Sequence, residues 1–374
     1  MNNQNPFKNT RVEFHILQSF PVSCLNRDDV GSPKTAIVGG CTRARVSSQC
    51  WKRYVRLSMN ELGVPSGTRT KLLSQLVVEA CKDEGATDEQ AQKCGQSVQN
   101  IFIKDEKTKE GKTNTETKED KKNDTLIFLS PNEIKAIALE FKTCEFAPDE
   151  VLTQKDAKKR AKELEKVVLK HTSSAVDALD VALFGRMVAQ ATNMNVEAAA
   201  SFAHAISTHK VNNEVEFFSA LDDRSNELGA AHLGSLEYNS ATYYRYISLD
   251  LGQLFNTLIG IELATAMEAF VKALFVAVPN ARQTTMSAAS HWDFAKIQVR
   301  KGQRLQLSFE TAIKPKDNGY LQPSIEALTQ QLSIKEQRAG SLFGKQVEWT
   351  FGEGSLSIDD LIHGLKQYIQ SVQS

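Results

Sequence analysis

The chain has no apolar run long enough to cross a membrane. None of the hydrophobic stretches in its 374 residues approaches the roughly 20 residues that a membrane-spanning helix needs. The N-terminal sequence MNNQNPFKNT also lacks the apolar stretch of a secretory signal peptide. We therefore expect no association with a membrane and a cytoplasmic location.

The cysteines lack the spacing of a metal site. Six cysteines are present and none forms a CxxC pair, so we expect reduced packing residues and no zinc. They are Cys24, Cys41, Cys50, Cys81, Cys94 and Cys144.

Familiar catalytic and cofactor motifs are absent too. The sequence contains no Walker loop, GxGxxG, GxSxG, HExxH or EF-hand pattern, and we expect no cofactor. His204 and His209 lie five residues apart, on different faces if the segment is helical, so we expect ordinary polar roles rather than a shared metal. Asp28 and Asp29 follow Arg27 directly; they are candidates for a metal-binding or catalytic pair, but loop-ordering roles fit their position better.

Net charge is also missing, because 45 Lys and Arg balance 45 Asp and Glu. A uniformly basic coat for nucleic acid is therefore excluded, whereas a local basic groove is not. Residues 27–56 hold seven bases and two acids, a net charge of +5. The bases are Arg27, Lys34, Arg43, Arg45, Lys52, Arg53 and Arg56.

This basic segment has the parts that an RNA backbone requires. Several cations can meet successive phosphates, and Gly39–Gly40 allows the backbone to approach closely. A helix predicted to start at Ser47–Ser48 adds free N–H groups and the positive end of its dipole. A helical wheel of residues 49–59 places Gln49, Lys52, Arg53 and Arg56 on one face. The alternative is a solvated surface helix that packs through Trp51.

Periodicity predicts strands at both ends of the chain around a helical block. Residues 11–18 alternate as a strand does, and the middle third is helical. Residues 104–125 contain no large apolar side chain, so we expect a disordered loop there. The pattern indicates an α+β domain with a large helical insertion.

Later segments give further predictions. Residues 176–187 are predicted as a buried strand that ends at Gly185. Residues 195–240 are predicted to be rich in loops with aromatic residues scattered among them. Residues 294–313 contain two strand-like runs, and a final helix begins at Ser357.

Ordered blocks of sequence resemble one family, the backbone subunit of the type I-E CRISPR surveillance complex Cascade (the CasC family). The first block joins SCLNRDD, AIVGG, RARVSSQ and KR within residues 23–53. Later blocks are ALFGRM, SFAHAISTHKV, FFSALDD, GAAHLGSLEYNSATYYRY, VPNARQTT and GYLQPS. The resemblance covers most of the chain except the helical block and the loop at 104–125.

The resemblance implies a hand-like fold of the RAMP class. It consists of an RRM-like (ferredoxin-like) palm, an inserted helical fingers domain and a thumb hairpin or loop. The implied divisions are palm at 1–57, fingers at 58–180, palm at 181–194, thumb at 195–235 and palm with a C-terminal helix at 236–374.

The resemblance also implies a non-catalytic function and its partners. Copies of the subunit assemble head to tail along the guide RNA (crRNA), together with other Cascade subunits, and present the guide to target DNA. The implied wedge that displaces a nucleotide is Met187 with Phe218, or Phe217 in its place. The full set of implied RNA contacts is Arg27, Lys34, Gly39, Gly40, Arg43, Arg45, Ser48, Gln49, Lys52, Arg53, Arg186, Met187 and Phe218. Cys41 stands where a basic side chain would suit the groove.

Two enzymatic alternatives remain open. One is a guide-processing endoribonuclease, which would need a catalytic His or Lys beside a Gly-rich loop; the nearest histidine to such loops is His363. The other is metal-dependent cleavage of target RNA by Asp28 or Asp29.

Overall fold

A computed structural model describes residues 5–102, 126–171, 176–188, 191–221 and 230–374. The chain divides into two compact units. The first comprises residues 1–63, 200–255 and 263–374, and the second comprises residues 64–199 and 256–262. The segment 181–194 is assigned to the palm by the sequence analysis, but its described residues group with the second unit.

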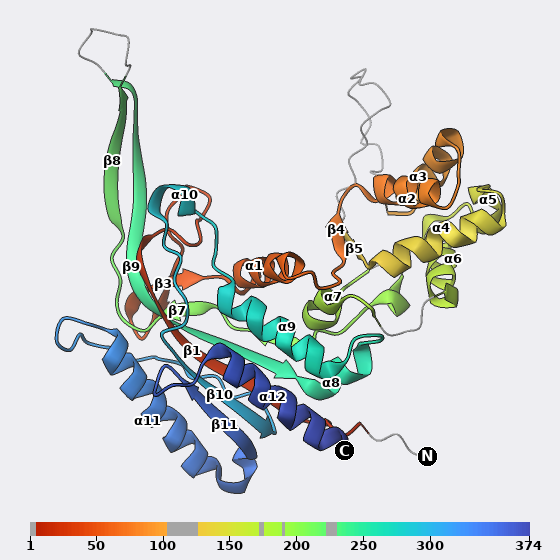
Figure 1. The fold of residues 1–374 in the computed structure, drawn as a ribbon. Helices are drawn as coiled ribbons and strands as arrows, with labels where there is room; N and C mark the ends of the chain where they lie inside the picture. Colours follow the sequence, from red (N-terminus) through yellow and green to blue (C-terminus); the bar gives the residue numbers. More distant parts are fainter. Residues whose placement is uncertain (1–4, 103–125, 172–175, 189–190, 222–229) are drawn as a thin grey trace. The chain divides into compact units, whose positions relative to one another are not determined.

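The first unit is built on a sheet of nine strands in which every pairing is antiparallel (Figure 1). The order across it is β11-β10-β1-β9-β7-β3-β2, and β6 and β8 each also pair with β9. The strands are β1 (Thr10–Ser23), β2 (Thr35–Val38), β3 (Cys41–Val46), β6 (Ala200–Phe202), β7 (Ala205–Ser207), β8 (Glu214–Leu221), β9 (Ala230–Asp250), β10 (Phe294–Lys301) and β11 (Lys345–Phe351).

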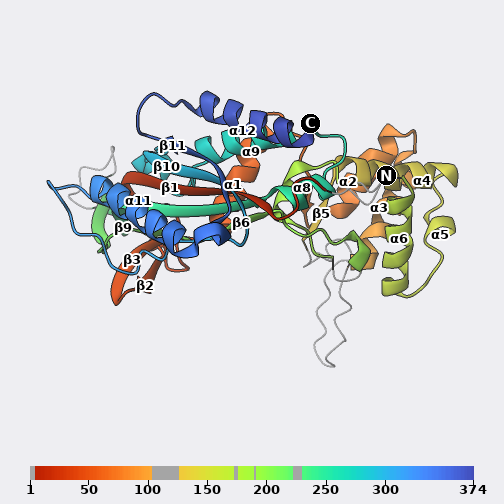
Figure 2. The same ribbon diagram turned by 90° about the horizontal axis from the view of Figure 1, so that it is seen from below.

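Helices cover both faces of this sheet. Figure 2 shows α9 (Leu263–Val276) and α12 (Ile358–Gln373) on one side and α11 (Leu321–Ala339) on the other. α1 (Ser48–Glu61) packs against α9, so it belongs to the first side. The remaining helical segments of this unit are α10 (Gln283–Met286) and η2 (Gly340–Phe343), while α8 (Leu251–Thr257) spans the boundary at Phe255.

Strand β1 is buried on both of its faces. Phe14 meets Phe270 of α9 edge-on, with ring centroids 6.3 Å apart. On the opposite face Leu17 packs in one cluster with Leu328 of α11. The alternation of residues 11–18 therefore predicts the strand correctly, but its polar side chains do not face water: Glu13 is fully buried.

Strand β9 pairs with four strands, and two of these pairings divide its length. Its first part pairs with β8 from Tyr238 to Ala230, and its second part pairs with β1 from Asn239 to Asp250. The β8–β9 hairpin therefore extends out of the sheet as a continuation of one strand (Figure 1). The sequence predicts residues 195–240 as loop-rich, whereas the described part of this segment contains β6, β7, β8 and the start of β9.

The second unit is a helical block with a two-stranded sheet. Its core brings together helices α2, α3, α4 and α6 through side chains such as Val77, Cys94, Phe141 and Leu164. The elements are β4 (Thr68–Thr70), α2 (Leu73–Asp83), α3 (Asp88–Phe102), β5 (Ile127–Leu129), α4 (Pro131–Thr143), α5 (Pro148–Val151), α6 (Ala157–His171), α7 (Leu179–Phe184) and η1 (Thr192–Met194). The predicted disordered loop at 104–125 lies outside the described residues.

Two predictions of strands are wrong. Residues 179–184 form α7, because a short run of buried apolar residues has the same composition in a helix as in a strand. Residues 303–313 alternate in burial from 304 to 310, but they form no ladder, and Phe309 has a positive φ of 45°. Their Leu305 and Leu307 N–H groups bond to side-chain oxygens instead. In the part of the chain described, no helix is long and apolar enough to cross a membrane.

His15 should make stability depend on pH. Burial, with the nearby Arg300 charge, lowers the pKa of His15 to about 3, so it is neutral when folded. The unfolded chain takes up this proton below about pH 6.5, so stability is lost as pH falls through that value. Between about pH 7.5 and pH 5 the loss from this group should be about 2 kcal/mol.

The measurement is the melting temperature of the wild type and His15→Gln at both pH values. The glutamine can still accept the hydrogen bond of Tyr244, whose hydroxyl lies 2.9 Å from His15 Nδ1. The variant should lose less stability than the wild type on acidification. An equal loss in both proteins would contradict the assignment.

Candidate nucleic-acid interface

The N-terminus of α1 is open to an anion. Ser47 caps the helix, because its hydroxyl accepts the Cys50 N–H at 3.2 Å. Asn26 Oδ1 in turn accepts the Ser47 N–H at 2.9 Å and ties the cap to the preceding loop. The first turn contains no acidic residue, so the positive end of the helix dipole is not neutralised there. The structure thus supports the start of the helix at Ser47–Ser48.

A buried arginine holds α1 on the sheet. Trp51 is almost fully buried, and the Arg245 guanidinium of β9 lies 3.6 Å from the centre of its ring. Arg245 also donates to Gln18 of β1. Because truncating a buried Trp costs about 3–5 kcal/mol, this contact contributes strongly to the position of the helix. Trp51 therefore packs as the surface-helix alternative predicts, and the same packing orients the basic face.

Five cations lie on α1 or on the loop and strand that precede it, and we call them the basic surface: Arg27, Lys34, Arg45, Lys52 and Arg53. Arg53 and Lys34 both act on the Cys50 thiol, whose pKa burial raises to about 11 against their opposing charges. Arg45 is joined to the loop by two bonds, from its N–H to the Lys34 carbonyl (2.8 Å) and from its Nε to the Thr35 carbonyl (3.2 Å). The structure therefore brings together cations that are up to 26 positions apart in sequence.

Aromatic rings lie beside two of these cations. The Lys52 ammonium is 5.8 Å from the centre of the Phe202 ring, and burial lowers the pKa of Lys52. The Arg53 guanidinium lies 5.5 Å from the ring centre of Tyr54. Gln49 and Arg53 are exposed, whereas Ser48, Lys52 and Arg56 are half-buried. The predicted basic face of the helix is thus present.

Sequence reasoning missed two members of this region. His204 is exposed, and its Nδ1 lies 3.4 Å from Nη1 of Arg45. Arg282 acts on the Cys24 thiol together with Arg27, so both cations lie close to it. The available signals were indirect: His204 directly precedes β7, which pairs with β3, and Arg282 belongs to the block VPNARQTT.

The two histidines have separate environments. His209 stacks on Tyr320 with ring centroids 3.7 Å apart. Its Nε2 accepts the Thr242 N–H at 3.1 Å, while Nδ1 lies 2.9 Å from the Lys210 carbonyl oxygen. Among the described residues no group of three His, Cys, Asp or Glu side chains could hold a metal ion. His209 is therefore a packing residue, and only His204 faces the basic surface.

A polar cavity of about 460 Å³ adjoins the basic surface. Arg27, Asp29 and Tyr54 contribute to its walls. Asp28 also lines it, but one of its carboxylate oxygens accepts the N–H groups of Val30 (3.0 Å) and Ser32 (2.9 Å). Asp28 thus orders its own loop through local hydrogen bonds, as the loop-ordering interpretation predicts.

Three of the residues predicted to contact RNA contact other parts of the protein instead. Arg43 is fully buried and donates to the carbonyls of Ser207, Phe309 and Glu310 at 2.8–3.2 Å. Arg186 is buried in an ion pair with Glu133 (2.6 Å) and also donates to the carbonyls of Met194 and Phe128. Gly39 makes a close backbone approach, but to Glu310: a Cβ on Gly39 would lie 1.9 Å from the Glu310 oxygen. Gly40 has open space around it.

The β8–β9 hairpin presents apolar side chains to solvent. Phe217 is 82% exposed and shares one face with Val215 and Leu233. Phe218, on the other face, is 40% exposed and lies over Gly234, where an added Cβ would come within 2.4 Å of its ring. Phe217 is thus the freer ring of the two. In the second unit Met187 is 84% exposed.

A second positive surface lies on the second unit. Helix α6 carries exposed lysines along one side, and these charges were not identified as a site from the sequence. They are Lys158, Lys159, Lys162 and Lys166.

Comparison with known proteins assigns the family. The family described as CT1975-like protein matches residues 12–365. The chain belongs to this family. No curated protein matches it.

Comparison with solved structures agrees with the family assignment. A chain of "CRISPR RNA-guided surveillance complex, pre-nicking" is 26% identical, with 96% of this chain and 99% of that chain covered and a TM-score of 0.75. A chain of "CRISPR RNA-guided surveillance complex" covers the same shares with a TM-score of 0.65; at 24% identity it supports the fold alone. These likenesses support a Cascade-type member of the CT1975-like family with a role in CRISPR interference.

His204 should make nucleic-acid binding depend on pH. Burial, then Arg45 and Lys34, lower the pKa of His204, so it is neutral at pH 7. A bound phosphate would favour the charged form, and binding would then take up a proton. Affinity should therefore rise as pH falls below about 6.5.

The measurement is RNA affinity from pH 7.5 to pH 5.5 for the wild type and His204→Gln. Glutamine keeps a polar side chain that does not titrate, so the variant should lose the part of the rise that comes from His204. Identical pH profiles would place His204 outside the interface.

Proposed function

We propose that this chain is a non-catalytic scaffold for guide RNA, the backbone subunit of a type I-E CRISPR surveillance complex in the CasC family. The observation that carries the proposal is the basic surface at the start of α1. It occurs in a chain that is similar over 96% of its length to a chain of an RNA-guided surveillance complex. A surface of several cations beside open helix N–H groups suits successive phosphates.

The topology of the first unit supports an RRM-like palm. Along the chain the elements run β1, α1, β7, β9, α9 and β10, and across the sheet the strands lie in the order β10-β1-β9-β7. This is the βαββαβ arrangement of ferredoxin-like folds. The helical second unit then corresponds to the fingers, and the β8–β9 hairpin to the thumb.

The chemistry of the basic surface favours binding that ignores sequence. Lys34, Arg45, Lys52 and Arg53 supply charge, and a phosphate carries the same charge beside every base. A guide RNA varies in sequence from one spacer to the next, so its scaffold must recognise backbone and shape. The bases then stay free to pair with target DNA.

Assembly along the guide requires further contacts. A head-to-tail filament needs two complementary surfaces on each copy, because such contacts do not close into a dimer. The neutral net charge is compatible with a molecule that meets copies of itself and other Cascade subunits over much of its surface. We propose these copies and subunits as partners.

The second positive surface supports a role for target DNA. Lys158, Lys162 and Lys166 follow one another at four-residue intervals on α6 and are exposed. Such a row can attract the phosphates of a duplex without reading its bases. We propose that the fingers use it while the guide is held by the basic surface.

The absence of catalysis is part of the proposal. Asp28 is engaged in its own loop, which favours a structural role over that of a metal ligand. Metal-dependent cutting of RNA paired to the guide, abolished by Asp28→Ala, would replace the scaffold with a nuclease. Cleavage of a hairpin repeat RNA by the purified chain would indicate guide processing.

The direct test is co-expression of the chain with a CRISPR array. The purified protein should carry RNA whose sequence contains spacers of that array. A protein that purifies without RNA and does not bind an added guide would overturn the proposed function.

Arg45→Ala and Lys52→Ala should each reduce the salt dependence of guide binding. Each lost phosphate contact should lower the magnitude of the slope of log affinity against log salt by about 0.7. The measurement is affinity at several salt concentrations on two guides with scrambled spacers, and both guides should lose affinity equally.

Lys335→Ala is the matched control for these variants. Lys335 is exposed on α11, which covers the other face of the sheet from α1 and α9. Its removal should leave the slope unchanged. Slopes unaltered by Arg45→Ala and Lys52→Ala, or a loss confined to one spacer, would contradict phosphate contacts at the basic surface.

The hairpin should act on the guide as an apolar wedge. Phe217→Ala should weaken displacement of a nucleotide, because unstacking costs a few kcal/mol that apolar contacts must offset. A fluorescent base analogue placed along the bound guide should be bright at regular positions in the wild type and dimmer in the variant. Phe218→Ala and Met187→Ala test the other predicted members, and an unchanged pattern in the triple variant would exclude the wedge.

A further inference from the structure

Residues 303–313 form a strap across the face of the sheet opposite α9. Leu307 and Phe309 are buried and share a core cluster with Tyr244 of β9 and Leu328 of α11. The strap forms no ladder with a strand, so its place depends on this burial and on hydrogen bonds, including those at its two ends.

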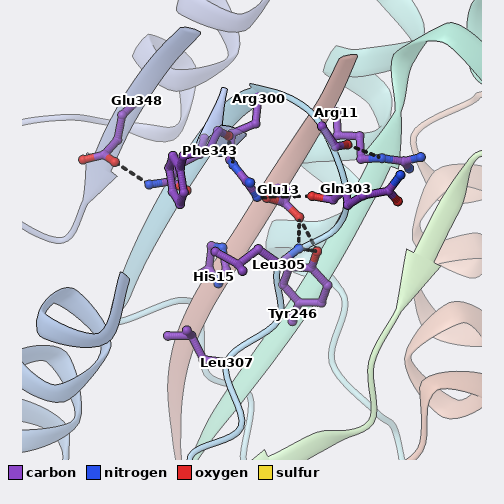
Figure 3. Close-up of polar contacts among 12 residues, drawn as sticks. Arg11, Glu13, His15, Tyr246, Arg300, Gln303, Leu305, Leu307, Phe343 and Glu348 are labelled. Carbon is purple, nitrogen blue, oxygen red and sulfur yellow. Dashed lines mark hydrogen bonds and ion pairs between the residues drawn. The ribbon is translucent and has the colours of Figure 1, made fainter. Parts of the chain in front are cut away.

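The first end is fixed to a buried ion pair (Figure 3). Glu13 of β1 pairs with Arg300 of β10, and the Leu305 N–H donates to Glu13 Oε1 at 2.8 Å. The same N–H lies 3.1 Å from the hydroxyl of Tyr246, which itself donates to Glu13. Glu13 is fully buried, so the loss of this geometry would leave a charge without its partners.

The second end is fixed to the β2–β3 hairpin. Arg43 of β3 donates through Nη2 to the carbonyls of Phe309 (3.2 Å) and Glu310 (3.1 Å). Its Nη1 donates to the Ser207 carbonyl of β7 at 2.8 Å. One guanidinium therefore joins the strap, the sheet and the hairpin. The Gly39–Gly40 turn contacts the same part of the strap, because the Gly39 backbone lies so close to the Glu310 oxygen that a Cβ would not fit between them.

The hairpin is also attached to the sheet near its base. Arg45 and Val46 pair with Ile206 and Ala205 of β7, and the Ala44 N–H donates to Ser207 Oγ at 3.0 Å. Closer to the turn, the Thr42 carbonyl accepts the Val211 N–H at 3.0 Å. Lys34 and Arg45, two cations of the basic surface, lie at the base of this hairpin. The direction in which they point thus depends jointly on this pairing and on what holds the far end of the hairpin.

We propose that the strap positions the β2–β3 hairpin for guide RNA and that Arg43 and Gly39 are positioning residues. They act through Lys34 and Arg45 and touch no RNA. This inference rests on the proposed function of the basic surface. It gives the buried Arg43 a role in binding that differs from the phosphate contact expected from the sequence.

The chain offers a matched pair of substitutions. Gly39 and Gly40 both have a positive φ, +58° and +72°, so alanine meets a similar backbone cost at either position. Only at Gly39 does the added Cβ meet another atom, the Glu310 oxygen; nothing lies within 4 Å at Gly40. Neither substitution changes the charge of the protein.

The experiment measures guide-RNA affinity for both variants in the wild type and in a Lys34→Ala/Arg45→Ala background. Gly39→Ala should weaken binding by about tenfold in the wild type, the equivalent of losing one or two contacts. Gly40→Ala should stay within about twofold. In the background without the two cations the effect of Gly39→Ala should disappear, because it acts through them.

Hydrogen exchange supplies a reading that does not need RNA. The Ile313 N–H donates to the Thr208 carbonyl at 2.9 Å, next to the strap's contact with Gly39. Gly39→Ala should speed its exchange, and Gly40→Ala should not. If Gly39→Ala does not fold, Arg43→Lys replaces it: the charge is kept, but the shorter ammonium group cannot serve all three carbonyls.

The outcomes separate the two proposals. A wild type that does not bind guide RNA would overturn the proposed function. Wild-type binding with equal effects of Gly39→Ala and Gly40→Ala, or an effect of Gly39→Ala that persists without Lys34 and Arg45, would overturn only the positioning role.

Discussion

The first unit depends on a single strand that pairs along its entire length. β9 pairs with β8 over its first part and with β1 over its second, so the hairpin cannot move without bending a strand that is fixed in the sheet. The same strand carries Arg245, which supports Trp51 and α1, and Tyr244 and Tyr246, which support the strap. The hairpin, the basic surface and the strap are therefore all supported by β9. The pairing register of this strand sets their positions relative to one another.

Arginines have two separate uses in this protein. Arg43, Arg245 and Arg300 are buried in the first unit, where each bonds to carbonyl, amide or carboxylate oxygens and joins elements distant in sequence. Arg45 and Arg53 keep exposed surface. A guanidinium suits both uses, because its planar fork can satisfy several oxygens while its face lies on an aromatic ring. The positive charge of residues 27–56 is thus divided between holding the fold and offering a surface to phosphate.

This division explains which features of the fold and the site could be predicted from the sequence. Alternation predicts β1 and β10, and the capping box at Ser357 predicts the start of α12, since each depends on neighbouring residues. The alternation of RARV places Arg43 and Arg45 on one side of a strand. It could not tell that Arg43 is fully buried whereas Arg45 keeps exposed surface. That difference depends on Phe309 and Glu310, more than 260 residues later. His204 was missed for the same reason, because its neighbour Arg45 becomes close only through the pairing of β3 with β7.

Charge also separates the roles of the hairpin and the basic surface. In residues 214–219 and 233–238 the hairpin has three acids, Glu214, Glu216 and Glu237, and no base. Such a segment repels phosphate, so any hold on RNA must come from its apolar side chains, Phe217 above all. The basic surface has the opposite charge, because it consists of five cations. A scaffold that must grip every guide equally and yet interrupt its stacking at fixed intervals needs both kinds of surface. A rigid strand such as β9 can hold them at a constant separation.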